Sequence, residues 1–215
     1  MEESLVNYTY TCVMRKILAF LLLVISSIFT NTATAASCSP TESMTEGPYY
    51  VSGSNVRNNI IDKQAGTKTT LTITIIDSSC KPVSNAQVDI WHANAAGQYS
   101  GVKGNSEKFL RGSVITNAKG QATFTTIFPG WYPGRVMHIH VKIWKGGSEV
   151  LTTQLFASDE QVAKIYAKGA YASRGNQNTT LAQDGIYRGL TNPKAHLLSI
   201  KIGKSIAAGA KIVLP

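Results

Sequence analysis

The 215-residue sequence predicts an all-β fold, an antiparallel β-sandwich with long loops and one short helix. Two observations indicate this fold. Short segments alternate between polar and apolar residues, as strands do when one face of a sheet is buried. Turns rich in glycine, asparagine and proline separate these segments, a pattern typical of antiparallel sandwiches. We expect one such domain over residues 37–215, which is long enough to bury a core of its own.

The first 36 residues have the pattern of a secretory signal peptide. A basic start at Met14–Lys16 is followed by an apolar segment, Ile17–Phe29, and by small residues with A-x-A at Ala33 and Ala35. The residues before Met14 form an upstream extension that fits this pattern poorly, so translation from Met14 is an alternative. The apolar segment is too short to span a bilayer comfortably. We expect an exported protein, secreted or periplasmic, whose mature chain has no membrane span.

Export determines how the cysteines are interpreted. Cys12 falls in the leader, which leaves Cys38 and Cys80. In an oxidising compartment we expect these two to form a disulfide that ties the mature N-terminus to the turn at 77–81. Two free thiols are one alternative. A lipid anchor at Cys38 is another, although the alanine at position 35 makes a poor lipoprotein cleavage site.

The charge of the chain bears on its partners. The formal net charge is +9 at pH 7, but the basic residues are scattered and form no block of five or six. Nucleic-acid binding is therefore not expected. A positive field of this kind attracts anionic small molecules or an acidic surface.

Six segments have the alternation of strands. They are residues 70–77, 86–92, 121–128, 136–144, 150–156 and 197–202. One helix is expected to begin after Ser158, a good N-cap residue with Gln161 in the capping-box position. Acidic residues in its first turn support this start, and Gly169 is expected to end it.

The strand at 136–144 carries the first functional candidates. His138 and His140 project from one face, because side chains two residues apart on a strand share a side. The other face is apolar, with Met137, Ile139, Val141 and Ile143. Two imidazoles on one strand face are either solvated residues or a pair of metal ligands.

A tyrosine close to these histidines favours the second interpretation. Tyr132 begins the tight Y-P-G-R turn, six residues before His138, and can fold back over that strand. A phenolate oxygen is a hard ligand that suits iron(III), and a trivalent ion keeps a tyrosine ionised although its free pKa is about 10. Two tyrosines and two histidines would make a four-ligand site, so a further phenolate is needed from elsewhere.

Four motifs together resemble those of the intradiol ring-cleavage dioxygenases. They are TEGPYY at 45–50, VDIWHANAAGQYS at 88–100, GWYPGR at 130–135 and HIH at 138–140. These non-haem iron(III) enzymes include catechol 1,2-dioxygenase and protocatechuate 3,4-dioxygenase. The resemblance covers essentially the whole mature chain. It implies one ferric ion per chain and cleavage of a catechol by O2 to a muconate-type diacid.

The resemblance also implies roles for individual residues. The iron ligands would be Tyr99, Tyr132, His138 and His140. Arg135 matches an arginine beside the iron that stabilises the carbanion-like catechol, and Gln154 matches its polar partner. Tyr132 would leave the metal and help to take up a proton. The segment that walls the substrate pocket is matched by Gly47, Pro48 and Tyr49.

The remaining histidines are not expected to bind metal. His92 matches a position that is not a ligand in the family, and we interpret it as structural. His196 lies beside a late strand with no motif around it, and a surface position is expected.

Two features depart from the catechol 1,2-dioxygenase type. The long helical N-terminal segment that forms the dimer in those enzymes has no counterpart before TEGPYY, and the leader indicates a secreted subgroup. The identity of the catechol and the oligomeric state, a homo-oligomer included, therefore stay open.

Two other interpretations fit parts of the sequence. The strands also resemble prealbumin-like sandwiches that serve as non-catalytic binding or adhesion modules, which need neither the two tyrosines nor the H-x-H pair. Zinc or copper at the histidines is the other interpretation, but two phenolates favour iron(III) over either metal. Metal analysis with a visible spectrum distinguishes all three.

Overall fold

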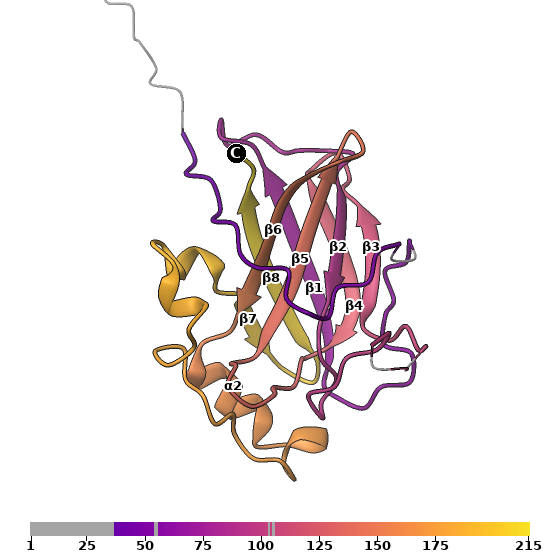
Figure 1. Ribbon diagram of the computed structural model, residues 1–215, viewed down its shortest axis with the longest axis vertical. Coiled ribbons are helices and arrows are strands. Elements are labelled where there is room, and N and C mark those ends of the chain that lie inside the picture. Colours follow the sequence, from indigo (N-terminus) through magenta and orange to yellow (C-terminus); the bar gives the residue numbers. More distant parts are fainter. Residues whose placement is uncertain (1–36, 54–55, 103, 105) are drawn as a thin grey trace, which may run out of the picture. The chain divides into compact units, whose positions relative to one another are not determined.

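The computed structural model describes residues 37–215 except 54, 55, 103 and 105. The proposed signal peptide lies outside the described residues. Within them, two four-stranded sheets enclose one main hydrophobic core (Figure 1). The predicted β-sandwich is confirmed.

The two sheets differ in how their strands pair, because one of them contains a parallel pair. The first sheet has the order β4-β1-β8-β7, with strands Gln121–Ile127, Lys68–Ile76, Ile206–Val213 and Ser199–Ile202. The second has the order β3-β2-β5-β6, with strands Arg111–Ile115, Gln87–Trp91, His138–Lys145 and Ser148–Phe156. All pairs are antiparallel except β1 with β8, which run parallel. This parallel pair is the one departure from the predicted antiparallel pairing among the described strands.

The six predicted strands are present, with boundaries shifted by up to two residues, and two further strands complete the sheets. Strand β8 has the sequence IAAGAKIV, in which alanines and a glycine weaken the strand signal. Strand β3 begins with Arg111 and Gly112, both buried, so its sequence lacks polar–apolar alternation. Pairing with neighbours distant in the sequence stabilises both segments.

The predicted helix is α2, Asp159–Tyr166. The Ser158 hydroxyl accepts a hydrogen bond from the Gln161 main-chain nitrogen at 3.3 Å, which confirms the predicted cap. The helix ends three residues before Gly169, where a short 3-10 helix, η1 (Gly169–Tyr171), begins. Two further 3-10 helices, η2 and η3, span Tyr187–Gly189 and Pro193–His196. No helix in the described part of the chain is long and apolar enough to cross a bilayer.

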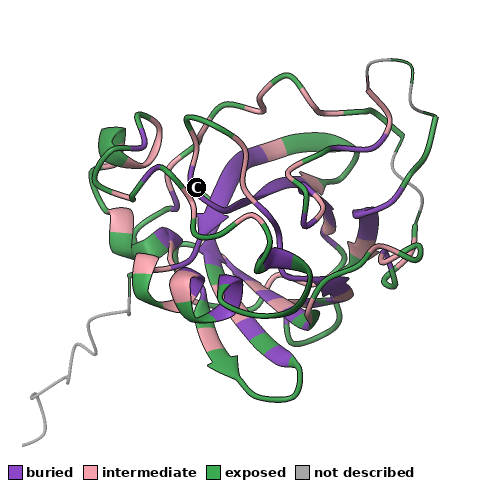
Figure 2. Ribbon diagram, turned by 90° about the horizontal axis from the view of Figure 1, so that it is seen from below, coloured by how far each residue is buried: buried purple, intermediate pink, exposed green. Residues whose placement is uncertain are grey.

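Both faces of strand β5 are buried. Its apolar face lies in the core, as predicted, with Met137 just before the strand and Ile139, Val141 and Ile143 on it. The opposite face carries His138, His140 and Lys142, each at most 4% exposed. Figure 2 shows that buried residues concentrate in the strands, whereas the connecting loops are largely exposed or intermediate.

An N-terminal strap, residues 38–50, covers the histidine face of the second sheet. It runs across the front of this sheet in Figure 1. The Met44 main-chain nitrogen donates to the Thr152 carbonyl at 2.8 Å, and Glu46 forms an ion pair with Lys142. Lys142 also pairs with Glu149 at 2.9 Å. Burial lowers the pKa of Lys142, but its hydrogen bonds to the two carboxylates outweigh that effect and raise it overall.

A disulfide ties the start of the strap to the turn after β1. Cys38 and Cys80 are bonded, with Cα atoms 5.3 Å apart and 42 residues of separation. The predicted pairing is therefore present, and the Cys38 sulfur is occupied by this bond. Closing a loop of this length is worth about 4 kcal/mol of chain entropy in the unfolded state.

The Cys38→Ser, Cys80→Ser double variant is expected to unfold more easily than the oxidised protein. The free energy of unfolding should fall by roughly 2–4 kcal/mol, because the unfolded chain regains the entropy that the bond removes. Urea denaturation followed by tryptophan fluorescence measures the change, and reduced wild-type protein is the matched control. Two free thiols in denatured, unreduced protein would contradict the pairing.

Candidate active site

The predicted site residues come from four segments that meet where β5 begins. His138 and His140 lie on β5, Gln154 lies on β6, and Tyr132 lies in the turn before β5. Tyr99 lies in the loop after β2. One cross-strand row over all four strands of the second sheet consists of Arg111, Trp91, His140 and Gln154. The sheet register therefore brings His140 and Gln154 side by side.

Two phenol oxygens converge on one imidazole nitrogen. The Tyr99 hydroxyl lies 3.2 Å from Nε2 of His138, and the Tyr132 hydroxyl lies 3.4 Å from the same atom. The His140 ring is next to them, with its centroid 4.8 Å from that of His138. The four residues predicted as iron ligands therefore form one cluster.

The main chain sets the tautomer of His138. Its Nδ1 lies 2.7 Å from the Val136 carbonyl oxygen. A carbonyl only accepts, so Nδ1 carries the proton and donates it. The lone pair is then on Nε2, which faces the two phenols. A hydrogen bond of this kind is the usual device that orients a metal-binding imidazole.

His140 has no such partner. Both of its ring nitrogens are buried, and neither has a hydrogen-bond partner among the described residues. An unpaired buried polar atom is costly, so a group that accepts the lone pair, such as a metal ion, would satisfy it. No group of three or more His, Cys, Asp or Glu suited to a metal occurs among the described residues. The donor set consequently depends on the two phenols, and it fits a hard ferric ion better than zinc.

Burial keeps all four candidate ligands neutral in the absence of a cation. It raises the pKa of Tyr99 well above its usual value and raises that of Tyr132, where the charge of Arg135 opposes the effect. Burial, together with the charge of Arg135, lowers the pKa of His138 to about 3. The pKa of His140 also lies well below its usual value, through burial and the neighbouring His138. A trivalent cation reverses this effect on the phenols and ionises them.

Arg111 fixes the loop that carries Tyr99. Its Nε donates to the Ser100 carbonyl oxygen at 3.0 Å, and its guanidinium carbon lies 6.0 Å from the centre of the Tyr99 ring. The Ser100 hydroxyl in turn donates to the Phe109 carbonyl oxygen at 2.6 Å. Burial lowers the pKa of Arg111 to about 10, so the side chain stays charged at neutral pH. Nothing in the R-G-S-V-I sequence around Arg111 indicates this role.

Arg135 is held between Asp184 and Gln154. Its Nε donates to a carboxylate oxygen of Asp184 at 2.7 Å, and its Nη2 donates to the Gln154 side-chain oxygen at 2.8 Å. The Gln154 amide nitrogen donates to the Thr45 carbonyl oxygen of the strap at 2.9 Å. The predicted pair of Arg135 and Gln154 is therefore in direct contact.

Asp184 is a site residue that the sequence did not reveal. Its side chain is fully buried, and its carboxylate also accepts hydrogen bonds from the main-chain nitrogens of Val136, Ile186 and Tyr187. Burial raises its pKa, but these main-chain donors and Arg135 outweigh that effect and lower it. A single aspartate in a Q-D-G turn has no distinguishing pattern, so only its tertiary partners identify it.

The predicted pocket wall lies against the ligand cluster. The Tyr49 ring stacks on that of Tyr99 with centroids 4.4 Å apart and meets Tyr132 edge-on at 5.9 Å. Gly47 lies under His140, where an added Cβ would be 3.3 Å from the ring carbon Cε1. Pro48 lies between these two residues in the strap.

The other two histidines lie outside the cluster. His92 is buried and makes two hydrogen bonds: Nδ1 donates to the Ala93 carbonyl oxygen at 2.9 Å, and Nε2 accepts from the Thr126 hydroxyl at 2.7 Å. These bonds agree with its structural interpretation. The surface position expected for His196 was wrong, since it is only 1% exposed. Its segment returns to β6, where Leu197 pairs with Phe156 and Nδ1 of His196 lies 3.3 Å from the Gln154 carbonyl oxygen.

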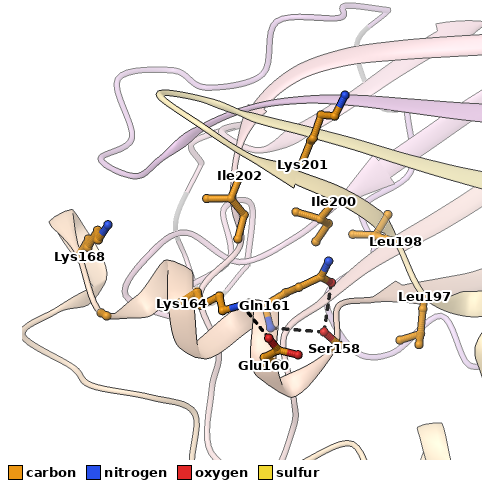
Figure 3. A pocket seen from close by; sticks show the side chains of 11 residues that line it. Ser158, Glu160, Gln161, Lys164, Lys168, Leu197, Leu198, Ile200, Lys201 and Ile202 are labelled. Carbon is orange, nitrogen blue, oxygen red and sulfur yellow. Dashed lines mark hydrogen bonds and ion pairs between the residues drawn. The ribbon is translucent and has the colours of Figure 1, made fainter.

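A separate groove of about 930 Å³ lies between α2 and β7 (Figure 3). Apolar side chains of Leu198, Ile200 and Ile202 face Gln161 and Lys164 of the helix across it. None of the residues predicted for the iron site lines this groove. The groove is therefore separate from the tyrosine–histidine cluster.

Comparison with known proteins finds dioxygenases among the proteins that this chain is similar to. A family model described as dioxygenase matches residues 45–185. The chain is 33% identical over 155 residues to catechol 1,2-dioxygenase of Acinetobacter baylyi, covering 60% of this chain and 49% of that protein. It is 34% identical over 113 residues to the protocatechuate 3,4-dioxygenase beta chain of Burkholderia cepacia, covering 46% and 48%. The chain thus spans about half the length of the curated relatives it matches.

A solved structure covers more of the chain. An intradiol ring-cleavage dioxygenase from Tetranychus urticae matches with a TM-score of 0.78 and 30% identity, covering 82% of this chain and 95% of that one. The matched family segment contains both tyrosines and both histidines of the cluster. The chain therefore belongs to the intradiol ring-cleavage dioxygenase family.

Proposed function

We propose that this protein is a non-haem iron(III)-dependent dioxygenase that cleaves a catechol-type aromatic between its two hydroxyl-bearing carbons. The substrates are the catechol and O2, and the product is a muconate-type diacid that contains both oxygen atoms. The observation that carries the proposal is the convergence of the Tyr99 and Tyr132 hydroxyls on His138 Nε2, at 3.2 and 3.4 Å, beside the unpaired ring of His140.

Tyr99, Tyr132, His138 and His140 would hold the ion. When bound, iron(III) supplies Lewis acidity toward the two catechol oxygens and withdraws ring electron density, which makes the ring reactive toward O2. Tyr132 is the more exposed of the two phenols and lies in a turn, whereas Tyr99 is only 6% exposed. The Tyr132 oxygen is therefore the one suited to accept a catechol proton as the substrate binds.

Arg135 has the chemistry to stabilise negative charge on the catechol ring. Its guanidinium is oriented by Asp184 and Gln154 before any substrate arrives. A charge fixed in advance in a largely buried site stabilises a developing anion without reorganisation. Tyr49 and Gly47 would exclude water from one side of the cluster.

Oxygen uptake with catechol tests the activity. Protein reconstituted with ferric ion should consume O2 with the substrate and form a product with the absorbance of a muconate-type diacid. Zinc-loaded protein is the control and should consume none. The yellow semialdehyde of extradiol cleavage would contradict the proposed reaction. Absence of O2 uptake with iron bound would instead favour a binding module.

Export to an oxidising compartment is a second part of the proposal. The leader pattern and the Cys38–Cys80 bond support it. Expression of the full chain followed by N-terminal sequencing of the exported product should find a start close to residue 37. A product that retains the leader and stays in the cytoplasm would contradict this part.

A further inference from the structure

The two histidines of the cluster are oriented by different means. His138 donates from Nδ1 to the Val136 carbonyl, but neither nitrogen of His140 has a partner among the described residues. A metal-bound imidazole is normally fixed by a hydrogen bond from its second nitrogen. Without that bond, the ring of His140 needs another restraint against rotation.

Trp91 restrains one face of the ring. The indole and the imidazole are almost parallel, with an interplanar angle of 5° and centroids 4.8 Å apart. The two residues are direct cross-strand neighbours on β2 and β5, and each is 1% exposed. Rotation of the imidazole about its bond to Cβ would drive an edge of the ring into the indole. This stack therefore sets the plane of the ring.

The indole contributes through its faces and not through its nitrogen. Trp91 Nε1 is buried and has no hydrogen-bond partner among the described residues. A buried unpaired N–H is unfavourable, so the benefit of a tryptophan here must come from its large aromatic surface. Tyr50 packs against the same indole with centroids 4.9 Å apart, which holds the indole in place.

Gly47 restrains the ring at Cε1. Its main chain passes so close that a Cβ would lie 3.3 Å from this atom. The strap is held in this position by Gln154, whose amide donates to the Thr45 carbonyl, and Gln154 is the cross-strand neighbour of His140 on β6. Gly47 also has φ of +73°, which favours glycine by itself.

We propose that Trp91 and Gly47 are positioning residues that aim His140 at the metal through ring stacking and main-chain contact in place of a hydrogen bond. The inference rests on the proposed iron site, because it concerns how one of that site's ligands is aimed. Trp91→Leu would leave the imidazole plane free to turn. Gly47→Ala would press a methyl group against Cε1 and displace the ring or the strap.

Iron affinity measured against a competing ferric chelator tests the proposal. The readout is the visible phenolate-to-iron band at equilibrium, together with the unfolding midpoint of each metal-free protein. Trp144→Leu is the matched control for Trp91→Leu, since Trp144 lies on the same face of β5, beyond Lys142 and away from the histidines. Gly175→Ala is the control for Gly47→Ala, because Gly175 has φ of +70° and no atom within 4 Å of an added Cβ.

Trp91→Leu and Gly47→Ala are expected to lose about 10- to 100-fold in iron affinity. Trp91→Phe keeps a smaller stacking surface and should fall between Trp91→Leu and the wild type. Trp144→Leu and Gly175→Ala should bind iron as the wild type does, even where their metal-free forms unfold earlier. If Trp91→Leu does not fold, Trp91→Phe and Gly47→Ala still decide the question.

Wild-type affinity in both Gly47→Ala and Trp91→Phe would overturn the inference, and so would equal losses in the two controls. Either result would leave the iron site itself intact. A wild-type protein that shows no band after ferric reconstitution would instead overturn the proposed function on which the inference rests.

Discussion

His140→Ala is expected to lose the visible colour of the ferric protein together with its iron. A ferric ion bound to ionised tyrosine absorbs visible light by charge transfer from phenolate to metal, so purified protein with about one iron per chain should be red-brown. The substitution removes one of the four proposed ligands, and His140 has no hydrogen-bonding neighbour in the described part of the chain that could replace it. Metal-binding free energies of roughly 10–16 kcal/mol over four ligands imply a loss on the order of 100-fold or more in affinity.

Spectroscopy with iron analysis measures this effect and separates the ligands. His138→Ala should behave in the same way, and Tyr99→Phe should alter or abolish the band because it removes a phenolate. His92→Ala is the control, since His92 is hydrogen-bonded to Thr126 and Ala93 outside the cluster, so its loss should affect stability but not colour. Adding a catechol without O2 should shift the band to longer wavelength. An unchanged band in His140→Ala would remove this residue from the ligand set.

Arg135→Ala is expected to keep the iron and lose most of the turnover. The guanidinium is not among the proposed ligands, but Asp184 and Gln154 hold it close to Tyr132, where it would face the catechol. Removing one oriented donor of this kind typically lowers kcat by about 10²- to 10³-fold, or roughly 2.7–4 kcal/mol of barrier. Oxygen uptake at saturating catechol gives kcat, and the visible band reports that iron is still bound. Normal turnover in Arg135→Ala would exclude the arginine from the mechanism.

Asp184→Asn tests whether the orientation of Arg135 matters as well as its charge. The substitution keeps the shape of the side chain but weakens the 2.7 Å ion pair and disturbs the main-chain bonds to Val136 and Tyr187. We expect kcat to fall while iron content stays constant. Asp62→Asn is the matched control, because the Arg57–Asp62 pair is partly exposed and lies outside the cluster. Equal kcat values for Asp184→Asn and Asp62→Asn would show that Gln154 alone suffices to orient Arg135.

Local pattern was enough to predict the sandwich and most of its elements. Alternation identified six strands, and the cap at Ser158 identified the helix. The two-residue period of a strand placed His138 and His140 on one face, and the Y-P-G-R turn placed Tyr132 near them. Tyr99 was found only through its motif, since a tyrosine in a turn has no local feature that marks it as a ligand.

What local pattern missed depends on contacts between distant segments. Strand β8 has a weak sequence signal and is stabilised by pairing with β1, where Thr72 lies opposite Gly209, 137 residues later in the chain. His196 looked like a surface residue, but its segment folds back on β6 and buries it. Asp184 and Arg111 have unremarkable sequence surroundings, and their roles come entirely from their partners.

The sequence by itself predicted which residues form the tyrosine–histidine cluster, because ligand type, strand period and the family motifs are properties of the residues and their immediate neighbours. Only the tertiary structure decided how those residues are aimed. The strap covers the histidine face, Asp184 and Gln154 orient Arg135, and Trp91 stacks on His140. Each of these contacts joins segments that are distant in the sequence and that meet through strand pairing or a reversal of the chain. The free energy that stabilises this arrangement comes from the whole core.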